Sequence, residues 1–176
     1  MKYFTKDEIQ ELLRVAKKHS ERDWLLLAVA YLYGFRATEA VSLHSDQVRD
    51  GKIVVQREKN SRETTQPLLS HSNELLNVKR HLEEKKGWIF PSRKGSGHIS
   101  RGQFWRIVQR YADLADVDLR VAHPHALKRS IAVHSHTAGI RNVSNHLGHK
   151  SLSSTYIYLR GFEDEAASRA VFAAVV

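Results

Sequence analysis

The chain has 176 residues, a length that suits one domain with its own hydrophobic core. It carries 28 Lys and Arg residues against 19 Asp and Glu, and the resulting net charge of +9 favours a polyanionic partner, nucleic acid above all. The absence of cysteine excludes disulfides and cysteine-ligated metal sites, and no apolar run approaches the ~20 residues that a membrane span needs.

The first part of the chain predicts helices. Residues 5–8, Thr-Lys-Asp-Glu, form a capping box ahead of apolar residues at helical spacing. Residues 23–33 are apolar on most faces and predict a central, buried helix that ends at the following glycine. Arg36 comes next, at a turn between helices. It either pairs with Glu39 on the surface or holds its planar guanidinium ready for two oxygens of a phosphate.

Residues 46–68 change to strand patterning. Asp50-Gly51 is typical of a two-residue hairpin turn. Residues 52–56 and 64–68 predict two strands. The connection between them, residues 57–63, is a charged turn that either contacts a partner or is simply a solvated loop tip. Its basic residues are Arg57, Lys59 and Arg62.

The middle of the chain predicts two helices separated by a basic loop. Residues 70–86 form the first helix. Three of its leucines should face the core: Leu75, Leu76 and Leu82. The loop carries Arg93 and Lys94, which face either phosphate or water. The second helix opens at Ser100 with an S-x-x-Q capping box, and Arg101 lies in its first turn.

A further helix starts at the His-Pro-His sequence of residues 123–125, with proline at a tolerated first-turn position. His125, Lys128 and Arg129 have the spacing i, i+3 and i+4, so they share a face of this helix. The amides at its start would add to an anion site.

The stretch from Leu147 to Tyr158 predicts a sharp reversal. Gly148 suits the end of one helix, and Ser151 suits the cap of the next. The reversal would bring His149 and Tyr158 to one pocket. A phenol, with a pKa of about 10, is a weak nucleophile at neutral pH and needs donors to the phosphoryl oxygens that it attacks. The plain alternative is a helical corner with buried aromatics.

Taken in order, Arg36, Lys59, His125, His149 and Tyr158 resemble the catalytic residues of the tyrosine recombinases, the phage integrase family. The resemblance spans nearly the whole chain. It is closest to the short, single-domain members that invert fimbrial promoter segments, and the alternative is a catalytic domain excised from a longer member. It implies a single catalytic domain over residues 1–176. The expected fold is mainly α, of the α+β class, with one small antiparallel sheet at about residues 46–68.

The resemblance also implies a chemistry. The chain would be a site-specific recombinase or integrase that cuts and rejoins double-stranded DNA without metal or nucleotide cofactor. Tyr158 would attack the scissile phosphate, forming a 3′-phosphotyrosyl bond and freeing a 5′-hydroxyl. Arg36 would clamp the non-bridging oxygens, and Lys59 would protonate the leaving oxygen. His125 would take or position the tyrosine proton, and His149 would donate to a phosphoryl oxygen.

One position departs from the family motif His-x-x-Arg, because Lys128 stands where the motif has arginine. An ammonium is a point charge and lacks the bidentate fork, so we expect Lys128 to occupy the site with weaker transition-state stabilisation. Arg129 should point about 100° away around the helix. The alternative function is a DNA-binding module of this fold with impaired or no catalysis. Tyr156 is a rival nucleophile, but the motif spacing selects Tyr158.

The basic residues assigned to DNA contacts are Arg57, Arg62, Arg93, Lys94, Arg101 and Arg129. Recombination needs a synapse of protomers, so we expect a dimer to tetramer on DNA, with a terminal helix at residues 163–176 docking on a neighbour. The N-terminus shows no signal-peptide pattern, and we expect a cytoplasmic, nucleoid-associated protein. A metal site built from His134, His136, His146 and His149 is the less favoured alternative, because no acidic or Cys partner has the usual spacing.

Overall fold

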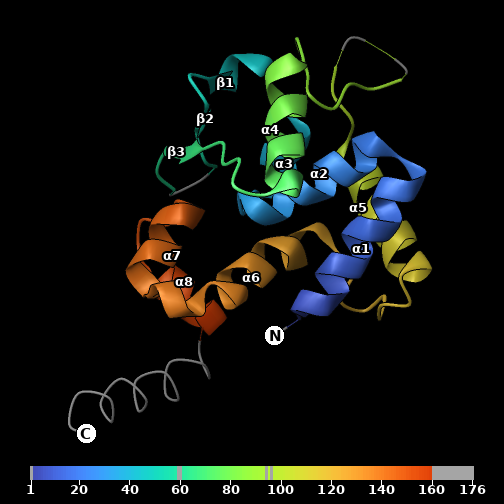
Figure 1. Ribbon diagram of the computed structural model, residues 1–176. Helices are drawn as coiled ribbons and strands as arrows, with labels where there is room; N and C mark the ends of the chain where they lie inside the picture. Colours follow the sequence, from blue (N-terminus) through green and yellow to red (C-terminus); the bar gives the residue numbers. More distant parts are fainter. Residues whose placement is uncertain (1, 59–60, 94, 96, 160–176) are drawn as a thin grey trace, which may run out of the picture.

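The computed structural model describes residues 2–58, 61–93, 95 and 97–159, and it is mainly helical with one three-stranded sheet (Figure 1). The longer helices are α1 (Lys6–His19), α2 (Glu21–Leu32), α4 (Asn73–Glu84), α5 (Arg101–Leu114) and α6 (Pro124–His134). The shorter ones are α3 (Ala37–Val41), α7 (Ile140–Leu147) and α8 (Leu152–Leu159), with 3₁₀ turns η1 (Ser45–Gln47) and η2 (His136–Ala138). The predicted fold class is confirmed. The predicted terminal helix at 163–176 lies outside the described residues.

Local capping signals fix the starts of the helices. The Thr5 hydroxyl accepts from the amide of Glu8 at 3.2 Å, and the Glu8 carboxylate accepts from the amide of Thr5 at 2.6 Å, which confirms the predicted capping box. Ser100 opens α5 in the same way, and His123 caps α6, whose first residue is proline. Helix α2 is buried from Asp23 to Ala30, as its apolar sequence predicts.

The sheet has the order β1-β2-β3, from β1 (Val48–Arg49), β2 (Lys52–Val55) and β3 (Thr64–Pro67), with antiparallel pairing throughout. Asp50 and Gly51 both have positive φ, 52° and 68°, as a type I′ turn requires. The predicted hairpin is confirmed. Ile53 and Val55 face the main core.

Helix α4 begins at Asn73, three residues later than predicted, because Ser72 caps it by accepting from the amide of Leu75. The prediction for Leu76 is wrong: its side chain is 49% exposed. Val78 and Leu82, four residues apart, form the buried stripe instead. Leu76 lies two residues before Val78, about 200° around the helix, and so faces outward.

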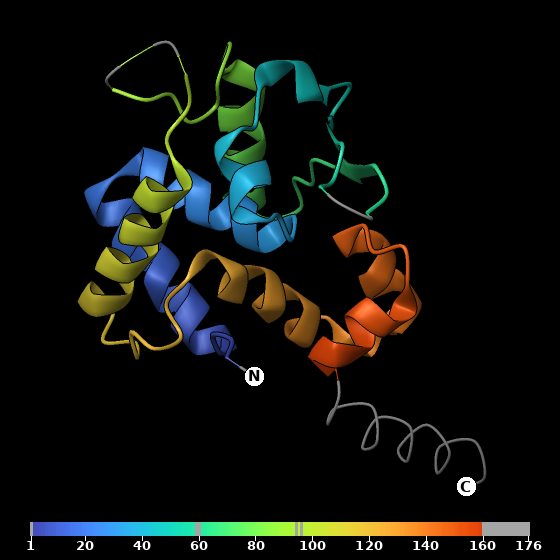
Figure 2. The ribbon, with the colours of Figure 1, turned by 180° about the vertical axis from the view of Figure 1, so that it is seen from behind.

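Helix α6 connects two parts of the molecule. Figures 1 and 2 show it running from the side of α1 and α5 to the pair α7 and α8. There Ala132, Val143 and Leu147 form a small second core, with Tyr158 packed against it. Helix α7 also contacts β3. None of the described helices is both long and apolar enough to cross a membrane.

Candidate active site

The structure brings Tyr158 and His125 together, although 33 residues separate them in the sequence. The Tyr158 hydroxyl lies 3.3 Å from Nε2 of His125. The ring of His149 is 5.8 Å from the Tyr158 ring, centre to centre. Helices α6 and α8 and the turn between α7 and α8 therefore each contribute one of three predicted site residues.

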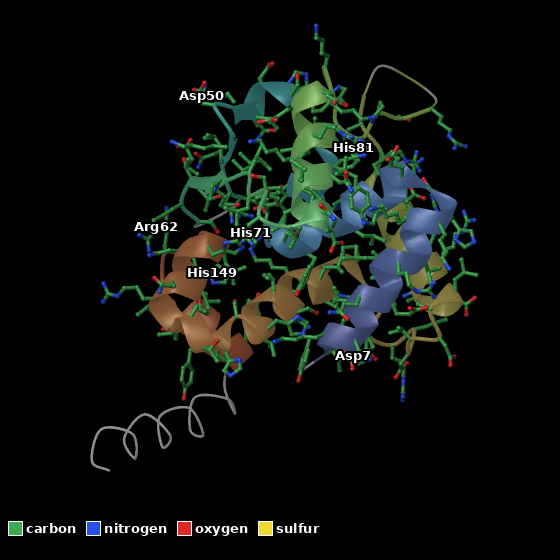
Figure 3. The ribbon with its side chains drawn as sticks, in the orientation of Figure 1. Asp7, Asp50, Arg62, His71, His81 and His149 are labelled. Carbon is green, nitrogen blue, oxygen red and sulfur yellow. The ribbon has the colours of Figure 1, made fainter. Side chains whose placement is uncertain are left out.

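The turn that carries His149 is docked on the strand side of the site. Gly148 ends α7 in the left-handed conformation, with φ of 71°. A Cβ atom here would lie 2.8 Å from Cγ of Arg57, so only glycine fits this approach. The Gly148 carbonyl accepts from the amide of Arg62 at 2.9 Å. Nδ1 of His149 bonds the Thr155 hydroxyl at 2.8 Å, which fixes the orientation of the ring. Figure 3 shows His149 on the same side of the molecule as Arg62.

Arg36 caps the start of α3 and is held by two side chains. Its Nη1 donates to Glu39 at 2.8 Å, and its Nη2 donates to the Ser61 hydroxyl at 2.9 Å. The predicted pairing with Glu39 is therefore present. It leaves 26% of the Arg36 side chain exposed, so the guanidinium can still contact an anion. Its charge reaches the site: it is among the charges that lower the pKa of both His125 and His149. A guanidinium fixed in this way is oriented before any anion arrives.

Arg57 differs from its prediction as an exposed DNA contact. Its side chain is fully buried beneath the site, paired with Glu39 at 2.9 Å. Each guanidinium nitrogen has a protein acceptor, and the group stacks over the ring of Phe35 at 4.6 Å. The acceptors are Thr64, Gly34, Glu39, Tyr33, Gln66 and His146. This arginine has no donor left for a phosphate, and we withdraw it from the DNA-contacting set.

Glu39 organises both arginines. Burial raises the pKa of its carboxyl, but the amide of Arg36 and the charges of Arg57 and Lys128 outweigh that effect and lower the pKa to about 2. Glu39 is therefore ionised at neutral pH. The buried Glu39 carboxylate therefore holds two guanidiniums in place. The sequence had suggested only a surface pair between Arg36 and Glu39.

Lys128 is buried, with 1% of its surface exposed, and its Nζ donates to the Leu147 carbonyl at 3.2 Å. Burial, with the charge of Arg57 acting in the same direction, lowers the pKa of this ammonium to about 7. Lys128 therefore lies at the base of the site and bonds the last residue of α7.

Arg129 acts on the phenol of Tyr158, which its predicted direction did not indicate. Burial raises the pKa of the Tyr158 hydroxyl, and the charge of Arg129, together with a hydrogen bond from its side chain, opposes that rise. The Nε atom of Arg129 is buried and has no hydrogen-bond partner among the described residues. Arg129 is thus a member of this cluster.

The two histidines are neutral at physiological pH. Burial, followed by the charges of Arg129 and Lys128, lowers the pKa of His125 to about 4. Burial and the charges of Lys128 and Arg36 lower the pKa of His149 to about 4 as well. A neutral His125 can accept the phenol proton through Nε2, and the cations around it favour the phenolate that would result.

The remaining predicted DNA contacts, together with the predicted catalytic Lys59, fall in two groups. Arg62, Arg93 and Arg101 are exposed, and Arg62 also donates to the His149 carbonyl at 3.1 Å. Lys59 and Lys94 lie outside the described residues. The catalytic role expected for Lys59 therefore stays a prediction.

The histidines proposed as metal ligands have other partners. Nε2 of His146 bonds the Leu32 carbonyl at 2.9 Å, and Nδ1 of His134 bonds the Tyr31 hydroxyl at 2.9 Å. His149 is held by Thr155. In the part of the chain that the structure describes, no three His, Cys, Asp or Glu side chains are grouped to hold a metal ion.

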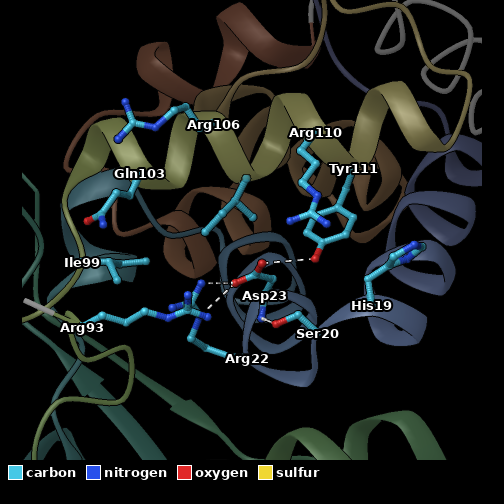
Figure 4. A pocket seen from close by; sticks show the side chains of 11 residues that line it. His19, Ser20, Arg22, Asp23, Arg93, Ile99, Gln103, Arg106, Arg110 and Tyr111 are labelled. Carbon is cyan, nitrogen blue, oxygen red and sulfur yellow. Dashed lines mark hydrogen bonds and ion pairs between the residues drawn. The ribbon is translucent and has the colours of Figure 1, made fainter.

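A second basic region, which the sequence analysis missed, surrounds Asp23 (Figure 4). It is a pocket of about 430 Å³ between α5, the loop before it and the junction of α1 and α2. Four arginines line it: Arg22, Arg93, Arg106 and Arg110. Arg106 and Arg110 are four residues apart on α5 and so lie on one face of it. This spacing in the sequence could have indicated the basic region.

Comparison with known proteins agrees with this geometry. The model of the phage integrase family matches residues 2–165. The type 1 fimbriae regulatory protein FimB of Escherichia coli K12 is 31% identical over 169 residues, which cover 89% of this chain and 82% of FimB. The tyrosine recombinase XerD of Bradyrhizobium diazoefficiens is 29% identical over 188 residues, which cover 92% of this chain but only 59% of XerD.

Solved structures share the fold. The site-specific recombinase XerH, in its pre-cleavage complex with the difH substrate, matches with a TM-score of 0.71 at 22% identity. The match covers 95% of this chain and 52% of XerH. The chain therefore spans about half of that recombinase and less than two thirds of the XerD protein.

Proposed function

The chain belongs to the phage integrase family of tyrosine recombinases, and from that premise we propose that it cuts and rejoins double-stranded DNA at specific sites through a covalent bond to Tyr158. We take it as one catalytic domain. The observation that supports the proposal best is the 3.3 Å approach of the Tyr158 hydroxyl to Nε2 of a neutral His125.

In the proposed reaction the Tyr158 oxygen attacks phosphorus while its proton passes to Nε2 of His125. The bond from phosphorus to the 5′-oxygen breaks as the tyrosyl bond forms, and the leaving oxygen takes a proton, for which the resemblance points to Lys59. Arg36 and His149 would donate to the non-bridging oxygens. Reversal by a 5′-hydroxyl rejoins the strand, and the phosphotyrosyl bond conserves the energy of the original phosphoester.

The geometry favours Tyr158 over Tyr156 as the nucleophile. Tyr156 is 47% exposed on α8. Tyr158 points toward His125 and packs against the small core of α6 and α7. Two residues along a helix lie about 200° apart, so the two hydroxyls cannot share one pocket.

The partners are proposals of the same kind. XerH, similar in fold, is bound to its difH DNA in the matched structure. We propose double-stranded DNA as the substrate and a homo-oligomer, dimer to tetramer, as the active assembly. We also propose action at the nucleoid in the cytoplasm, and inversion of a DNA segment as the outcome, in keeping with the resemblance to the fimbrial type.

The test is to trap the covalent intermediate. A pool of randomised duplexes, each carrying a nick, is incubated with the protein, and protein–DNA adducts are separated on a denaturing gel. We expect an adduct with the wild type and with Tyr156→Phe, and none with Tyr158→Phe, because only Tyr158 lies beside His125. An adduct that persists in Tyr158→Phe and disappears in Tyr156→Phe would contradict the assignment.

A second candidate function is DNA binding without turnover. The observation that favours it is the Lys128 ammonium, which bonds the Leu147 carbonyl at 3.2 Å and is 1% exposed. A wild type that binds the pool with a steep salt dependence but yields no adduct would support this second function.

A further inference from the structure

The family motif has one arginine after its histidine, three residues on, and this chain has lysine there with arginine following. We infer that Arg129, in place of Lys128, is the second guanidinium that binds the phosphate attacked by Tyr158, and that Lys128 instead anchors α6 to the end of α7. The inference rests on the proposed function and concerns which residue of that site, Arg129 or Lys128, binds the phosphate.

The position of Arg129 supports this division. Arg129 follows His125 by four residues on α6, and side chains at this spacing are neighbours on a helix surface. Helix α6 packs against α8, which carries Tyr158. The Tyr158 hydroxyl meets His125 at 3.3 Å, so the arginine one turn along α6 stands on the same side of the phenol.

The electrostatics agree with this position. Among the charges acting on His125, that of Arg129 lowers its pKa the most, after burial. Arg129 and Arg36 are the two charges that lower the pKa of Tyr158 against burial, and only Arg129 adds a hydrogen bond. Lys128 is not among the charges that shift the pKa of that phenol. The two guanidiniums therefore act on Tyr158 from the start of α3 and from α6.

Arg129 also differs from the other two arginines of the cluster in its partners. Arg36 and Arg57 are both paired with Glu39. Within the described residues Arg129 forms no ion pair, and its buried Nε has no acceptor. A buried N–H without an acceptor destabilises the folded protein. Among the described residues, therefore, no ion pair would compete with an arriving phosphate for this side chain.

Lys128 is occupied elsewhere. Its Nζ donates to the carbonyl of Leu147, the last residue of α7. A cation is favourable at a helix C-terminus, where carbonyls lack partners. The bond fixes the turn that presents His149, two residues further on. Lys128 is therefore a positioning residue, and Arg129 a residue that contacts the reacting atoms.

The experiment compares Arg129→Gln with Lys128→Gln in two assays, with Arg80→Gln as the control. Arg129→Gln should slow adduct formation in a single turnover by about 100-fold, the usual effect of removing one donor to a developing charge. Arg129→Lys should recover only part of that loss, because an ammonium cannot replace a bidentate fork. Arg80→Gln, an exposed arginine of α4 away from the site, removes the same charge and should leave the rate unchanged.

The second assay needs no DNA. Titration of ring-labelled Tyr158 by NMR should show a higher phenol pKa in Arg129→Gln than in the wild type, and no rise in Lys128→Gln. Lys128→Gln should instead lower the thermal midpoint. A purely structural role for Arg129 would lower the midpoint and leave the phenol pKa where it is.

The outcomes separate the two proposals. If the wild type forms an adduct and Arg129→Gln forms it at the same rate, the inference is wrong and the recombinase proposal stands. If Lys128→Gln slows the reaction about 100-fold and raises the phenol pKa while Arg129→Gln does neither, the roles are the reverse of those inferred here. If the wild type gives no adduct, the recombinase proposal fails and the inference falls with it.

Discussion

The arginines around Glu39 and those around Asp23 differ in how many of their donors the protein itself occupies. Arg57 is buried with an acceptor at every guanidinium nitrogen, and Arg36 is held by Glu39 and Ser61. In the Asp23 pocket the carboxylate takes two bonds from Arg22, at 2.6 and 2.9 Å, and one from the Tyr111 hydroxyl. Within the described residues Arg93, Arg106 and Arg110 have no carboxylate partner.

This difference separates two uses of the same side chain. Near Glu39 the guanidiniums are fixed before any ligand arrives, as a site that stabilises a transition state requires. Around Asp23, Arg93, Arg106 and Arg110 are exposed and keep their donors for solvent or a phosphate backbone, where they add affinity and long-range attraction. Changes to the first region should therefore alter stability and chemistry, and changes to the second should alter mainly the salt dependence of binding.

The largest effect should come from Glu39→Gln. The change removes the only carboxylate on Arg57 among the described residues and leaves a buried guanidinium without its counter-charge. Breaking one partner of a buried ion pair typically costs about 3–5 kcal/mol. We expect that loss in the free energy of unfolding, measured by urea denaturation at pH 7.

Glu83→Gln is the matched control. Glu83 pairs with Lys79 at 4.0 Å on the surface of α4, with the Glu83 side chain 41% exposed. Surface pairs of this kind contribute about 0–1 kcal/mol. Equal losses in the two variants would mean that the Glu39 cluster has no special role in stability.

A smaller effect on the free energy of unfolding, which changes with pH, is expected from the titration of Lys128. Its pKa falls from the usual 10.5 to about 7 in the folded protein, so between these pH values the unfolded chain binds more protons than the folded one. Stability should therefore rise as the pH increases from 7, at up to about 1.4 kcal/mol per pH unit, because the penalty for burying the ammonium is lifted.

Lys128→Met isolates this contribution. We expect the wild type to gain about 2 kcal/mol relative to Lys128→Met between pH 7 and pH 9, in urea unfolding followed by circular dichroism. Comparing the change with pH, and not the absolute stability, removes the cost of losing the bond to Leu147. Parallel pH curves for the two proteins would show that Lys128 keeps an ordinary pKa.

Local features of this fold were predictable, and features set by distant partners were not. The capping boxes and the Asp50-Gly51 turn depend on residues a few positions apart, and the structure confirms them. The burial of Arg57 depends on carbonyls at Tyr33 and His146, 24 and 89 residues away, which no local pattern reveals.

The candidate site shows the same limit. The order of Arg36, His125, His149 and Tyr158 pointed to one pocket, and the structure brings these residues together. The direction of Arg129 was estimated from helix geometry alone. Helix geometry gives the angle of the Arg129 side chain around α6. It does not reveal that α8 packs against α6 and brings Tyr158 within the influence of Arg129.

The smallest effect should come from the Asp23 pocket. Arg93→Gln and Arg106→Gln each remove one exposed guanidinium that lines it. If each contacts one phosphate, the slope of log affinity against log salt should become shallower by about 0.9 per substitution, with affinity lost evenly across DNA sequences. Fluorescence anisotropy with the randomised duplex pool at several salt concentrations would measure both quantities.

Arg80→Gln, an exposed arginine outside the pocket, serves as the control, because a loss of net charge alone would change its slope equally. Equal slopes for all three variants would place the pocket outside the DNA interface and leave only the Glu39 side of the molecule facing the duplex.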